Sequence, residues 1–499
     1  FGHFVRTSGT YALTGRGRTN TYPLFAEKSR QVINNLGRVG IVVPSGIATD
    51  DTTKYFFQDL MKMRSLVSFY DFENREGIFI GVHRSFKFAL VTMTGIEAST
   101  SKAEFVFFAQ QVSDLGDINR RFALSAEDIA RLNPNTGTTA IFRNRHDAEI
   151  ATNIYRHIPI LIRRIPEFQN LWLTDITRML NMSDDAELFN TYKDMIEQGC
   201  ILRGHSFING TEVFLPLYEA KMFWHFDHRW ATYDDDSTRE LPSSEKSNLQ
   251  LAQPRYWVEQ SKLYKHMSGH DVNWLISFRD ITNSTNERTA VFSILPFVAL
   301  AHPSPMLFIN QTALLHTAIV ACLNSYVVDY LARQKVGGTH LSYVILEQLP
   351  IIPPHAYTPA LLDFILPRVL ELTYTAWDLQ PFAQDVGWDG PPFIWDEERR
   401  FLMRCELDAL YFHLYQIQRQ DVNYIMETFP IVKRKDEAAH GEYRTKQVIL
   451  KMYDQMAALP KMAVPAPKDE TTYDVPDVSQ WTTWLSPGPA DPAVAHREK

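Results

Sequence analysis

The alternation of apolar and polar positions divides the first 110 residues into helices and strands. Apolar side chains recur at helical spacing over residues 19–36, which predicts an amphipathic helix. The run RVGIVVP, residues 38–44, predicts a short strand, and a second helix is expected over residues 53–63. Strands follow in SLVSFYDF and in RSFKFALVTM, whose almost continuous apolar character predicts burial on both faces. This order is that of the second half of an α/β sandwich, so we expect an incomplete sheet whose first strands precede Phe1.

The pattern changes along the rest of the chain and predicts four further segments. Residues 111–200 are helical and mixed in pattern, as in a connector. Residues 201–355 alternate aromatic, β-prone stretches with turns, interrupted by a helix over 313–332, and predict a mixed α+β domain. Residues 356–458 carry a helical pattern, clearest in EERRFLMRCELDALYFHLY. Residues 459–499 contain seven prolines and little periodicity, and predict a disordered tail.

Composition narrows the class of protein. A chain of 499 residues with 45% hydrophobic content is long enough for several packed domains. Its net charge of -8 means that any nucleic-acid contact must come from a local basic surface. Cys200, Cys322 and Cys405 lie far apart without CxxC spacing, which disfavours a disulfide scaffold or zinc ribbon and favours a reducing cytoplasm. No signal peptide or membrane span is visible, so we expect a cytoplasmic protein with no membrane partner.

Two short motifs offer metal or nuclease chemistry. The string HFDH contains His225, Asp227 and His228, but in a strand the third of these points away from the other two. Because no partner cluster of ligands is evident, we expect no metal there. In YEAK, Glu219 and Lys221 match half of a metal-dependent nuclease site, in which a carboxylate holds Mg²⁺ and a lysine activates water. This half-motif is common by chance, and the nuclease stays an alternative.

Three polar segments are candidates for binding phosphates or base edges. GRGRTN, residues 15–20, precedes a helix and would cradle an anion at the helix N-terminus. SFRDITNSTNERT, residues 277–289, crowds together arginine and asparagine, the side chains suited to guanine and adenine edges. ARQKVGGTHLSY, residues 332–343, places two glycines between cations and a polar pair, between an expected helix and an apolar strand. A solvated loop and an ordinary helix C-cap are the alternatives for the last two, and both stay open here.

Several separated strings together resemble the C-terminal portion of the adenine-specific DNA methyltransferases found in single-chain restriction–modification enzymes. The resemblance is to the type IIG-like class with a TaqI-like target recognition domain, and it covers nearly all of residues 1–458. It rests on SGTYALTGRGRTNTYPLFAEKSRQ, GRVGIVVPSGIATDDTTKYFFQDL, LNPNTGTTAIFRNRHDAE, LPLYEAKMFWHFDHRWATY, FRDITNSTNERT, NSYVVDYLARQKVGGTHLSYVILEQLPIIPP and FPIVKRKDEAAHGEYRTK. Such an ordered set is more specific than any single motif.

The resemblance implies methyl transfer from S-adenosylmethionine to N6 of adenine in a defined sequence of double-stranded DNA. It implies an incomplete Rossmann-like methyltransferase sheet in residues 1–110, a target recognition domain in 201–355 and a helical C-terminal region. In the family, a glycine motif for the cofactor and an Asn-Pro-Pro-aromatic catalytic motif precede the matching segment, and neither occurs in these 499 residues. We therefore expect this chain alone to be inactive, with the cofactor motif encoded ahead of residue 1. Restriction or defence-system subunits are further expected partners.

The resemblance also implies roles for individual residues. Phe79, within GIFIGVHRSFKFALV, matches the aromatic residue that stacks on the extruded adenine, and a core phenylalanine is the alternative. Asn20, Tyr22 and Pro44 are expected near the active site. In the recognition domain and its flanks the expected DNA contacts are Lys221, Arg229, Arg279, Asn286, Arg288, Arg333, Lys335, Gly337, Gly338, Thr339 and His340.

Three functions therefore compete at this point. The chain is expected to be the recognition-bearing half of an adenine methyltransferase, and it could instead be a DNA specificity module that acts with a separate catalytic partner. A Mg²⁺-dependent nuclease that uses Glu219 and Lys221 is the third hypothesis. A glycine motif and an Asn-Pro-Pro-aromatic motif in the reading frame upstream of Phe1 would separate the first two. Metal-dependent cleavage that is lost in Glu219→Ala would establish the third.

Overall fold

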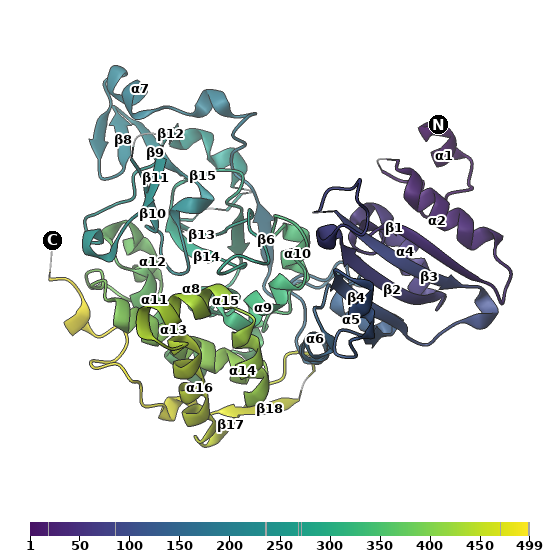
Figure 1. Cartoon of the computed structure of the whole chain (residues 1–499). Helices are drawn as coiled ribbons and strands as arrows, with labels where there is room; N and C mark the ends of the chain where they lie inside the picture. Colours follow the sequence, from purple (N-terminus) through teal and green to yellow (C-terminus); the bar gives the residue numbers. More distant parts are fainter. Residues whose placement is uncertain are drawn as a thin grey trace. The chain divides into compact units, whose positions relative to one another are not determined.

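The structure is a computed structural model that describes residues 1–17, 19–84, 86–234, 237–267, 269–270, 272–469 and 471–497. The chain is a mixed α/β protein with several small sheets, divided into two compact units (Figure 1). Unit 1 comprises residues 1–156 and 163–169, and unit 2 comprises residues 157–162 and 170–499. The boundary between the units falls inside the segment that the sequence pattern assigned to a connector, because α6 (Arg145–His157) belongs almost entirely to unit 1.

Unit 1 is built on a five-stranded sheet of order β1-β3-β2-β4-β5. β3 (Lys87–Thr94) lies antiparallel between β1 (Arg38–Pro44) and β2 (Leu66–Glu73), so β1 and β2 run parallel to each other. β2 also pairs in parallel with β4 (Ala103–Ala109), and β5 (Phe122–Leu124) closes the far edge. The carboxyl ends of β1, β2 and β4 therefore meet at one edge of the sheet.

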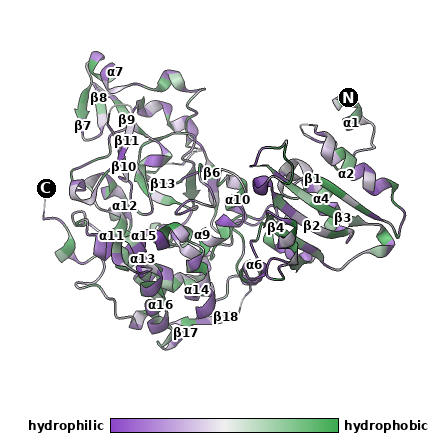
Figure 2. Ribbon diagram, viewed as in Figure 1, coloured by the Kyte–Doolittle hydropathy of each residue, from purple (hydrophilic) through white to green (hydrophobic). Residues whose placement is uncertain are grey.

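The helices of unit 1 follow the amphipathic pattern of the sequence. They are α1 (Gly2–Thr7), α2 (Thr21–Val32), α3 (Gly46–Thr49), α4 (Lys54–Lys62), α5 (Ala126–Leu132) and α6. The buried face of α4 carries Phe56, Phe57 and Leu60, and the sheet contributes Phe69 and Phe105, whose ring centroids lie 6.2 Å apart. Figure 2 shows hydrophobic residues concentrated along these strands. The predicted helices over 19–36 and 53–63 and the three predicted strands are thus present, with trimmed ends.

Strand β3 differs from its prediction in one respect. Its residues alternate between buried positions such as Ala89 and Val91 and partly exposed positions such as Leu90, as expected for a strand that is buried on one face only. The nearly continuous apolar run is explained by cross-strand packing on the second face, where Phe88 stacks on Phe72 at 5.3 Å.

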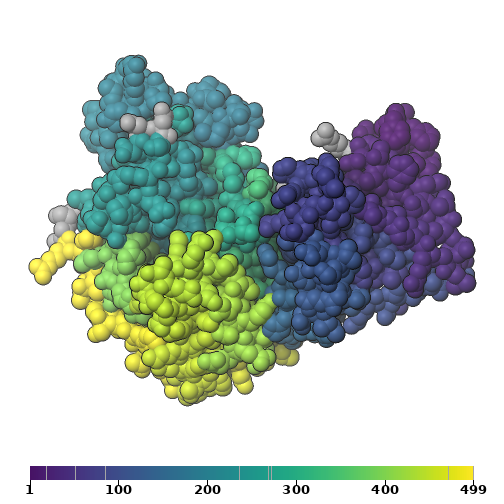
Figure 3. Space-filling view, in the orientation of Figure 1, coloured from purple at the N-terminus to yellow at the C-terminus, as the bar shows by residue number. Residues whose placement is uncertain are grey.

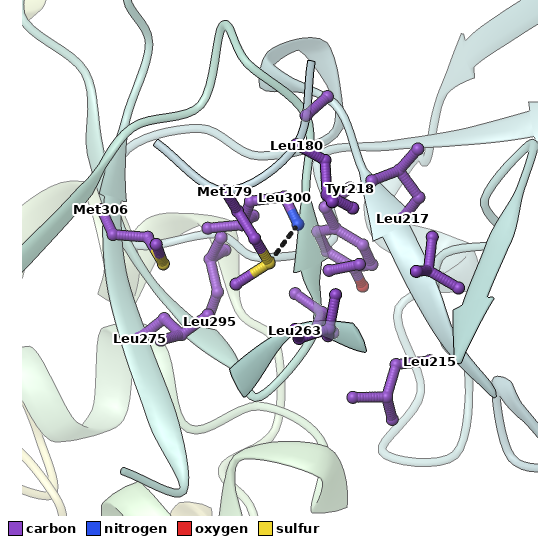
Figure 4. Packing of buried hydrophobic residues seen from close by; sticks show 14 of the residues in the cluster. Met179, Leu180, Leu215, Leu217, Tyr218, Leu263, Leu275, Leu295, Leu300 and Met306 are labelled. Carbon is purple, nitrogen blue, oxygen red and sulfur yellow. Dashed lines mark hydrogen bonds between the residues drawn. The ribbon is translucent and has the colours of Figure 1, made fainter. Parts of the chain in front are cut away.

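The β-rich part of unit 2 consists of small, mainly antiparallel sheets that enclose a large hydrophobic core, with a smaller cluster around Phe207 and Trp257. One sheet has the order β12-β9-β8-β7, with β15 paired in parallel to β9, and another has the order β14-β13-β16-β6. Their bounds are β6 Thr174–Thr177, β7 Ile201–Arg203, β8 Ser206–Asn209, β9 Glu212–Tyr218, β12 Trp257–Glu259, β13 Trp274–Phe278, β14 Phe292–Pro296, β15 Ala299–Leu300 and β16 Met306–Ile309, and a separate hairpin joins β10 Ala231–Asp234 to β11 Ser237–Glu240. Met179, Leu217 and Leu300 meet in the core, where the Leu300 amide lies 3.3 Å from the Met179 sulfur (Figure 4).

The long helix predicted over residues 313–332 is two helices, α8 (Ala313–Asn324) and α9 (Tyr326–Arg333). Ser325 between them is extended, at φ -67° and ψ 153°, and its hydroxyl accepts the Val328 amide as the N-cap of α9. The Asn324 side chain both accepts the Phe292 amide and donates to the Phe292 carbonyl, each at 3.0 Å, so β14 is tied to the break. Among the described residues no single helix is long and apolar enough to cross a membrane; the α8–α9 pair passes that test only jointly and is bent by 52°.

The remaining helices of unit 2 lie mostly in residues 343–457, whose later part is yellow-green in the space-filling view (Figure 3). They are α7 (Tyr192–Glu197), α10 (Tyr343–Glu347), α11 (Pro359–Thr373), α12 (Gln380–Asp385), α13 (Glu397–Leu414), α14 (Arg419–Glu427), α15 (Pro430–His440) and α16 (Arg444–Ala457). The segment expected to be a disordered tail instead forms a hairpin of β17 (Lys461–Pro465) and β18 (Thr472–Pro476). The buried Glu406 of α13 holds the following residues, because its carboxylate accepts from Trp481 and Thr483 at 3.0 and 2.7 Å.

Candidate nucleic-acid interface

The loop between β2 and β3 in unit 1 is organised by one buried asparagine. The Asn74 side chain accepts the Phe79 amide at 2.9 Å and donates to the carbonyls of Phe79 and Val82 at 2.9 and 2.8 Å. A backbone bond from Asn74 to the Phe86 carbonyl at 3.0 Å closes the base of the loop. These hydrogen bonds satisfy backbone N–H and C=O groups of the loop that have no partner in a helix or strand.

Apolar side chains project from this loop. Ile80 is 97% exposed, Phe79 is 42% exposed, and Ile78, Val82 and Phe86 are also exposed. One edge of the Phe79 ring meets the Phe88 ring at a centroid distance of 4.8 Å and an interplanar angle of 80°. The core-phenylalanine alternative therefore does not describe Phe79, whose ring is half exposed on an ordered loop. Its stacking on a DNA base stays a prediction.

The Phe79 loop emerges at the edge of the sheet where β1, β2 and β4 end. Phe108, near the end of β4, has a φ of +57°, a left-handed conformation that non-glycine residues rarely adopt. Its amide donates to the buried Asp71 carboxylate at 3.2 Å, and its ring lies under Lys87 and Arg143, at 4.4 and 4.8 Å from the centroid. Ligands of open α/β sheets bind at the carboxyl ends of parallel strands, so this edge is the candidate site of unit 1.

Asp71 is held by groups of the chain itself. Burial raises the pKa of its carboxyl, and hydrogen bonds from the Ser45 hydroxyl and the Phe108 amide oppose that rise. Ser45 directly follows Pro44, so the residue expected near the active site does lie at this edge.

Tyr22 and Asn20 lie at the start of α2. Burial raises the pKa of the Tyr22 hydroxyl, and Asp50 adds to the rise, which places Tyr22 beside the loop that follows α3. Asn20 is the exposed N-cap residue of α2 and its side chain makes no capping hydrogen bond. In the candidate anion cradle GRGRTN, Arg18 lies outside the described residues, and the Gly17 carbonyl accepts from Arg6 at 3.1 Å.

In unit 2, two of the predicted DNA-binding segments run side by side. The Thr282 amide donates to the Thr339 carbonyl at 3.0 Å, and the Leu341 amide donates to the Asp280 carbonyl at 2.8 Å. The Asn283 side chain donates to the Gly338 carbonyl at 3.2 Å. We call residues 280–287 and 337–341 the paired loops. The paired loops expose Gly337, Gly338, Thr339, His340 and Asn286. The strand expected after Gly338 is absent, and the helix α10 begins at Tyr343.

Arg288 and Arg333 support the paired loops from within. Both guanidinium groups bind the fully buried Asp329 carboxylate, and the Thr289 amide donates to the same carboxylate at 3.0 Å. Arg333 also donates to the carbonyls of Asn286 and Glu287 at 2.6 and 2.7 Å. The prediction that these two arginines contact DNA is revised, because their side chains are about nine-tenths buried and their donors are used inside the protein.

Arg229 is likewise a structural residue. It is fully buried, and its guanidinium donates to the carbonyls of Ser247, Gln250 and Thr375. A DNA contact does not fit this position, because no part of the side chain reaches the surface. Burial lowers the pKa of Arg229, and nearby Asp378 and Asp227 oppose that change.

The HFDH string is not a strand; all three of its polar residues are buried. His225 pairs with the Ala290 carbonyl at 2.8 Å, His228 lies 3.0 Å from Asp378, and Asp227 forms a buried ion pair with Lys246. These partners come from different segments, so each side chain is already engaged. Within the described part of the chain, no group of three or more His, Cys, Asp and Glu residues could hold a metal ion.

The YEAK residues are engaged with each other and with a tyrosine. Glu219 accepts from the Tyr233 hydroxyl, and Lys221 lies 3.5 Å from Glu219 and over the Tyr233 ring at 4.7 Å. Lys221 is exposed and stays a candidate for a phosphate contact. Arg279 donates to the Phe223 carbonyl at 2.9 Å and stacks on Trp224 at 4.5 Å, and burial lowers its pKa to about 10.

Lys335 lies just after α9 and is only partly exposed. Burial of its ammonium group lowers the Lys335 pKa to about 7, so the side chain is only partly protonated at neutral pH. A phosphate contact from Lys335 therefore stays a prediction with a pH dependence of its own.

Sequence reasoning missed a polar cluster beside the paired loops. The buried Asp280 accepts from Arg178 at 2.8 Å and lies 3.3 Å from His340, and Arg178 lies 2.8 Å from His302. Arg178 and His302 are 102 and 22 residues from Asp280 along the chain, so no motif spacing joins them. The one available signal was that Asp280 and His340 both lie in segments already chosen as candidates.

No protein-family model and no curated protein matches this chain. Among solved structures, the chain is similar to the type IIG restriction endonuclease BpuSI, with a TM-score of 0.30 and 12% identity over 77% of this chain and 50% of that one. It is similar to the Type IIL restriction-modification enzyme MmeI in complex with DNA, with a TM-score of 0.42 and 8% identity over 85% and 54% of the two chains. A third similar structure is the ATP-dependent Type ISP restriction-modification enzyme LlaBIII bound to DNA. The TM-score is 0.36 and the identity is 8%, over 74% of this chain and 28% of that one. The chain thus spans about half the length of the first two.

Proposed function

We propose that this protein belongs to a DNA adenine-N6 methyltransferase of a restriction–modification or related defence system. Unit 1 supplies part of the catalytic domain, with an incomplete Rossmann-like sheet, and the β-rich part of unit 2 supplies target recognition. The observation that carries the proposal is the ordered, exposed Phe79 at the carboxyl edge of the parallel strands. An enzyme that methylates a base must first extrude it from the duplex, and a flat apolar side chain offsets part of the unstacking cost.

The paired loops support the recognition role. They expose the backbone of two glycines next to Thr339, His340 and Asn286, and the buried Asp329 binds Arg288, Arg333 and the Thr289 amide behind them. Reading a base sequence requires polar groups held in place, because a misplaced donor loses its discrimination between base edges.

S-adenosylmethionine is the methyl donor in this proposal, and it supplies the transferred methyl group when bound. The glycine motif that the resembling family uses for this cofactor is absent from the 499 residues. At the carboxyl edge of unit 1, the Asp71 carboxylate is already occupied by Ser45 and Phe108, so it does not fit a ribose hydroxyl. We therefore assign no residue of this chain to the cofactor and derive no step through it.

Two experiments test the proposal. Selection from a randomised duplex library should yield a defined sequence, and 2-aminopurine placed at its adenine should brighten when the protein binds. Joining the chain to its upstream reading frame should then give N6-methyladenine at that position, whereas the chain alone should not. Binding without any sequence preference would refute the recognition role. Sequence-specific binding with no methylation by the joined protein would favour a specificity module that needs a separate catalytic partner.

A further inference from the structure

The polar cluster around Asp280 holds an arginine in a fixed orientation at the side of the paired loops. The Asp280 side chain is 5% exposed, whereas Arg178 is 32% exposed and His340 is 56% exposed. The buried carboxylate oxygen Oδ2 accepts from Arg178 Nη2 at 2.8 Å. A carboxylate without solvent around it binds a guanidinium strongly, because the charge-assisted hydrogen bond compensates the burial of the carboxylate.

His302 constrains the same arginine from a second direction. Its Nε2 lies 2.8 Å from Arg178 Nη1, which is always a donor because a guanidinium has no acceptor. Nε2 is therefore the acceptor in this contact. Asp280 and His302 each use one N–H, so Nη1 and Nη2 each keep a second donor.

Nη1 and Nη2 of Arg178 thus each keep one N–H on a side chain that is partly exposed. Two parallel N–H groups of an arginine match the O6 and N7 acceptors of guanine in the major groove. The contacts with Asp280 and His302 restrict the orientation of the guanidinium, so less rotamer entropy is lost on binding. The cluster also continues into the paired loops, because His340 contacts the other carboxylate oxygen of Asp280.

We propose that Arg178 reads one guanine of the recognised DNA sequence, with Asp280 and His302 as positioning residues. This inference rests on the proposed recognition role of unit 2 and names one base of its target. A phosphate contact by Arg178 is a different outcome, since it would weaken binding to all sequences about equally. A purely structural arginine would change stability and leave base preference intact.

The test compares base preference in the wild type and in matched variants. A site is first selected from a randomised duplex library with the full chain, and Kd is then measured for that site and for each single-base replacement. Arg178→Lys keeps the charge but removes the guanidinium, and Asp280→Asn weakens the contact that orients it. Arg239→Ala is the control, because Arg239 forms an exposed ion pair with Glu245 in the same unit. Unfolding midpoints show whether each variant is folded.

Arg178→Lys should bind the selected site about tenfold more weakly and should lose the penalty for replacing one guanine, while the penalties at other positions stay unchanged. Asp280→Asn should lower discrimination at the same guanine without changing non-specific binding. A selected site without guanine, equal weakening at all positions, or an unchanged preference profile in Arg178→Lys would each overturn the inference while leaving DNA recognition intact. A wild type that selects no sequence would overturn the proposed function as well.

Discussion

Asn74 and Phe79 are joined by a two-way hydrogen-bond pair, in which the Asn74 amide accepts the Phe79 N–H and donates to the Phe79 carbonyl, both at 2.9 Å. Asn74 is fully buried, and the Phe79 ring is half exposed. The two side chains thus have different roles. Asn74 holds the backbone of the loop, and Phe79 exposes an apolar ring face. Base capture requires both, because a mobile aromatic ring would pay an entropy cost on binding.

Asn74→Ala should loosen the Phe79 loop without unfolding the sheet of unit 1. The substitution removes three hydrogen bonds from the loop and should cost about 1–3 kcal/mol in the free energy of unfolding. Amide hydrogen exchange should speed up at residues 79–82 and not in β1–β4. Asn35→Ala, which removes an exposed bond to Glu97, is the matched control and should leave the loop protected. Unchanged exchange at Phe79 would show that Asn74 does not organise the loop.

Phe79→Ala should weaken capture of an extruded base while leaving the fold unchanged. The ring contributes a stacking face, and its loss should reduce the 2-aminopurine signal of the intact protein on its selected site, since stacking of one base is worth about 1–3 kcal/mol. Phe79→Tyr keeps the ring and should keep most of the signal. Phe86→Ala serves as the control, because Phe86 is another exposed aromatic of the same loop. A lower unfolding midpoint with normal fluorescence would assign Phe79 to packing.

Asp329→Asn should destabilise unit 2. Removing the charge leaves Arg288 and Arg333 without a carboxylate in a buried environment, and breaking such a pair costs about 3 kcal/mol or more. Denaturant unfolding measures the change. Glu245→Gln breaks the exposed pair with Arg239 and should cost less than about 1 kcal/mol. Equal effects of the two variants would contradict a structural role for the Asp329 cluster.

Lys335→Met should stabilise the protein in a pH-dependent manner. The folded pKa of Lys335 is about 7, whereas the unfolded value is about 10.4, so the unfolded state binds more protons between these two pH values. The wild type therefore gains stability as pH rises from about 7 towards 10.4, and the advantage of Lys335→Met should be largest at or below pH 7 and vanish near pH 10.4. Unfolding curves at pH 6, 8 and 10 measure this difference.

The same substitution also tests a phosphate contact. A charged Lys335 that touches DNA should add about one unit to the salt slope of binding at pH 6 and little at pH 8.5. A salt slope that is identical in wild type and variant at both pH values would place Lys335 away from DNA. A stability difference that persists unchanged at pH 10 would show that burial does not lower the Lys335 pKa.

In unit 1, α2, α4 and β1–β3 could be predicted from the sequence, because their apolar residues recur at the spacing of a helix or a strand. The strands β4 and β5 were not predicted. The polar pattern also singled out residues 277–289 and 332–343, parts of which lie side by side in the structure. Their role in DNA recognition stays a prediction. Charge type alone could not assign roles within them. Arg288 and Arg333 are of the residue type expected to contact DNA, yet both form ion pairs with the buried Asp329 of α9.

Which cations can contact a ligand depends on the three-dimensional packing of the chain. The partner of a charged side chain can lie far away in the sequence: Arg178 donates to Asp280, which is 102 residues away. Burial is likewise a property of the whole packing, and it makes Lys335 a weak base and Arg229 a core residue. Hydrophobic periodicity is local and can be seen in the sequence. The pairing and desolvation of charges depend instead on contacts between residues that are far apart along the chain.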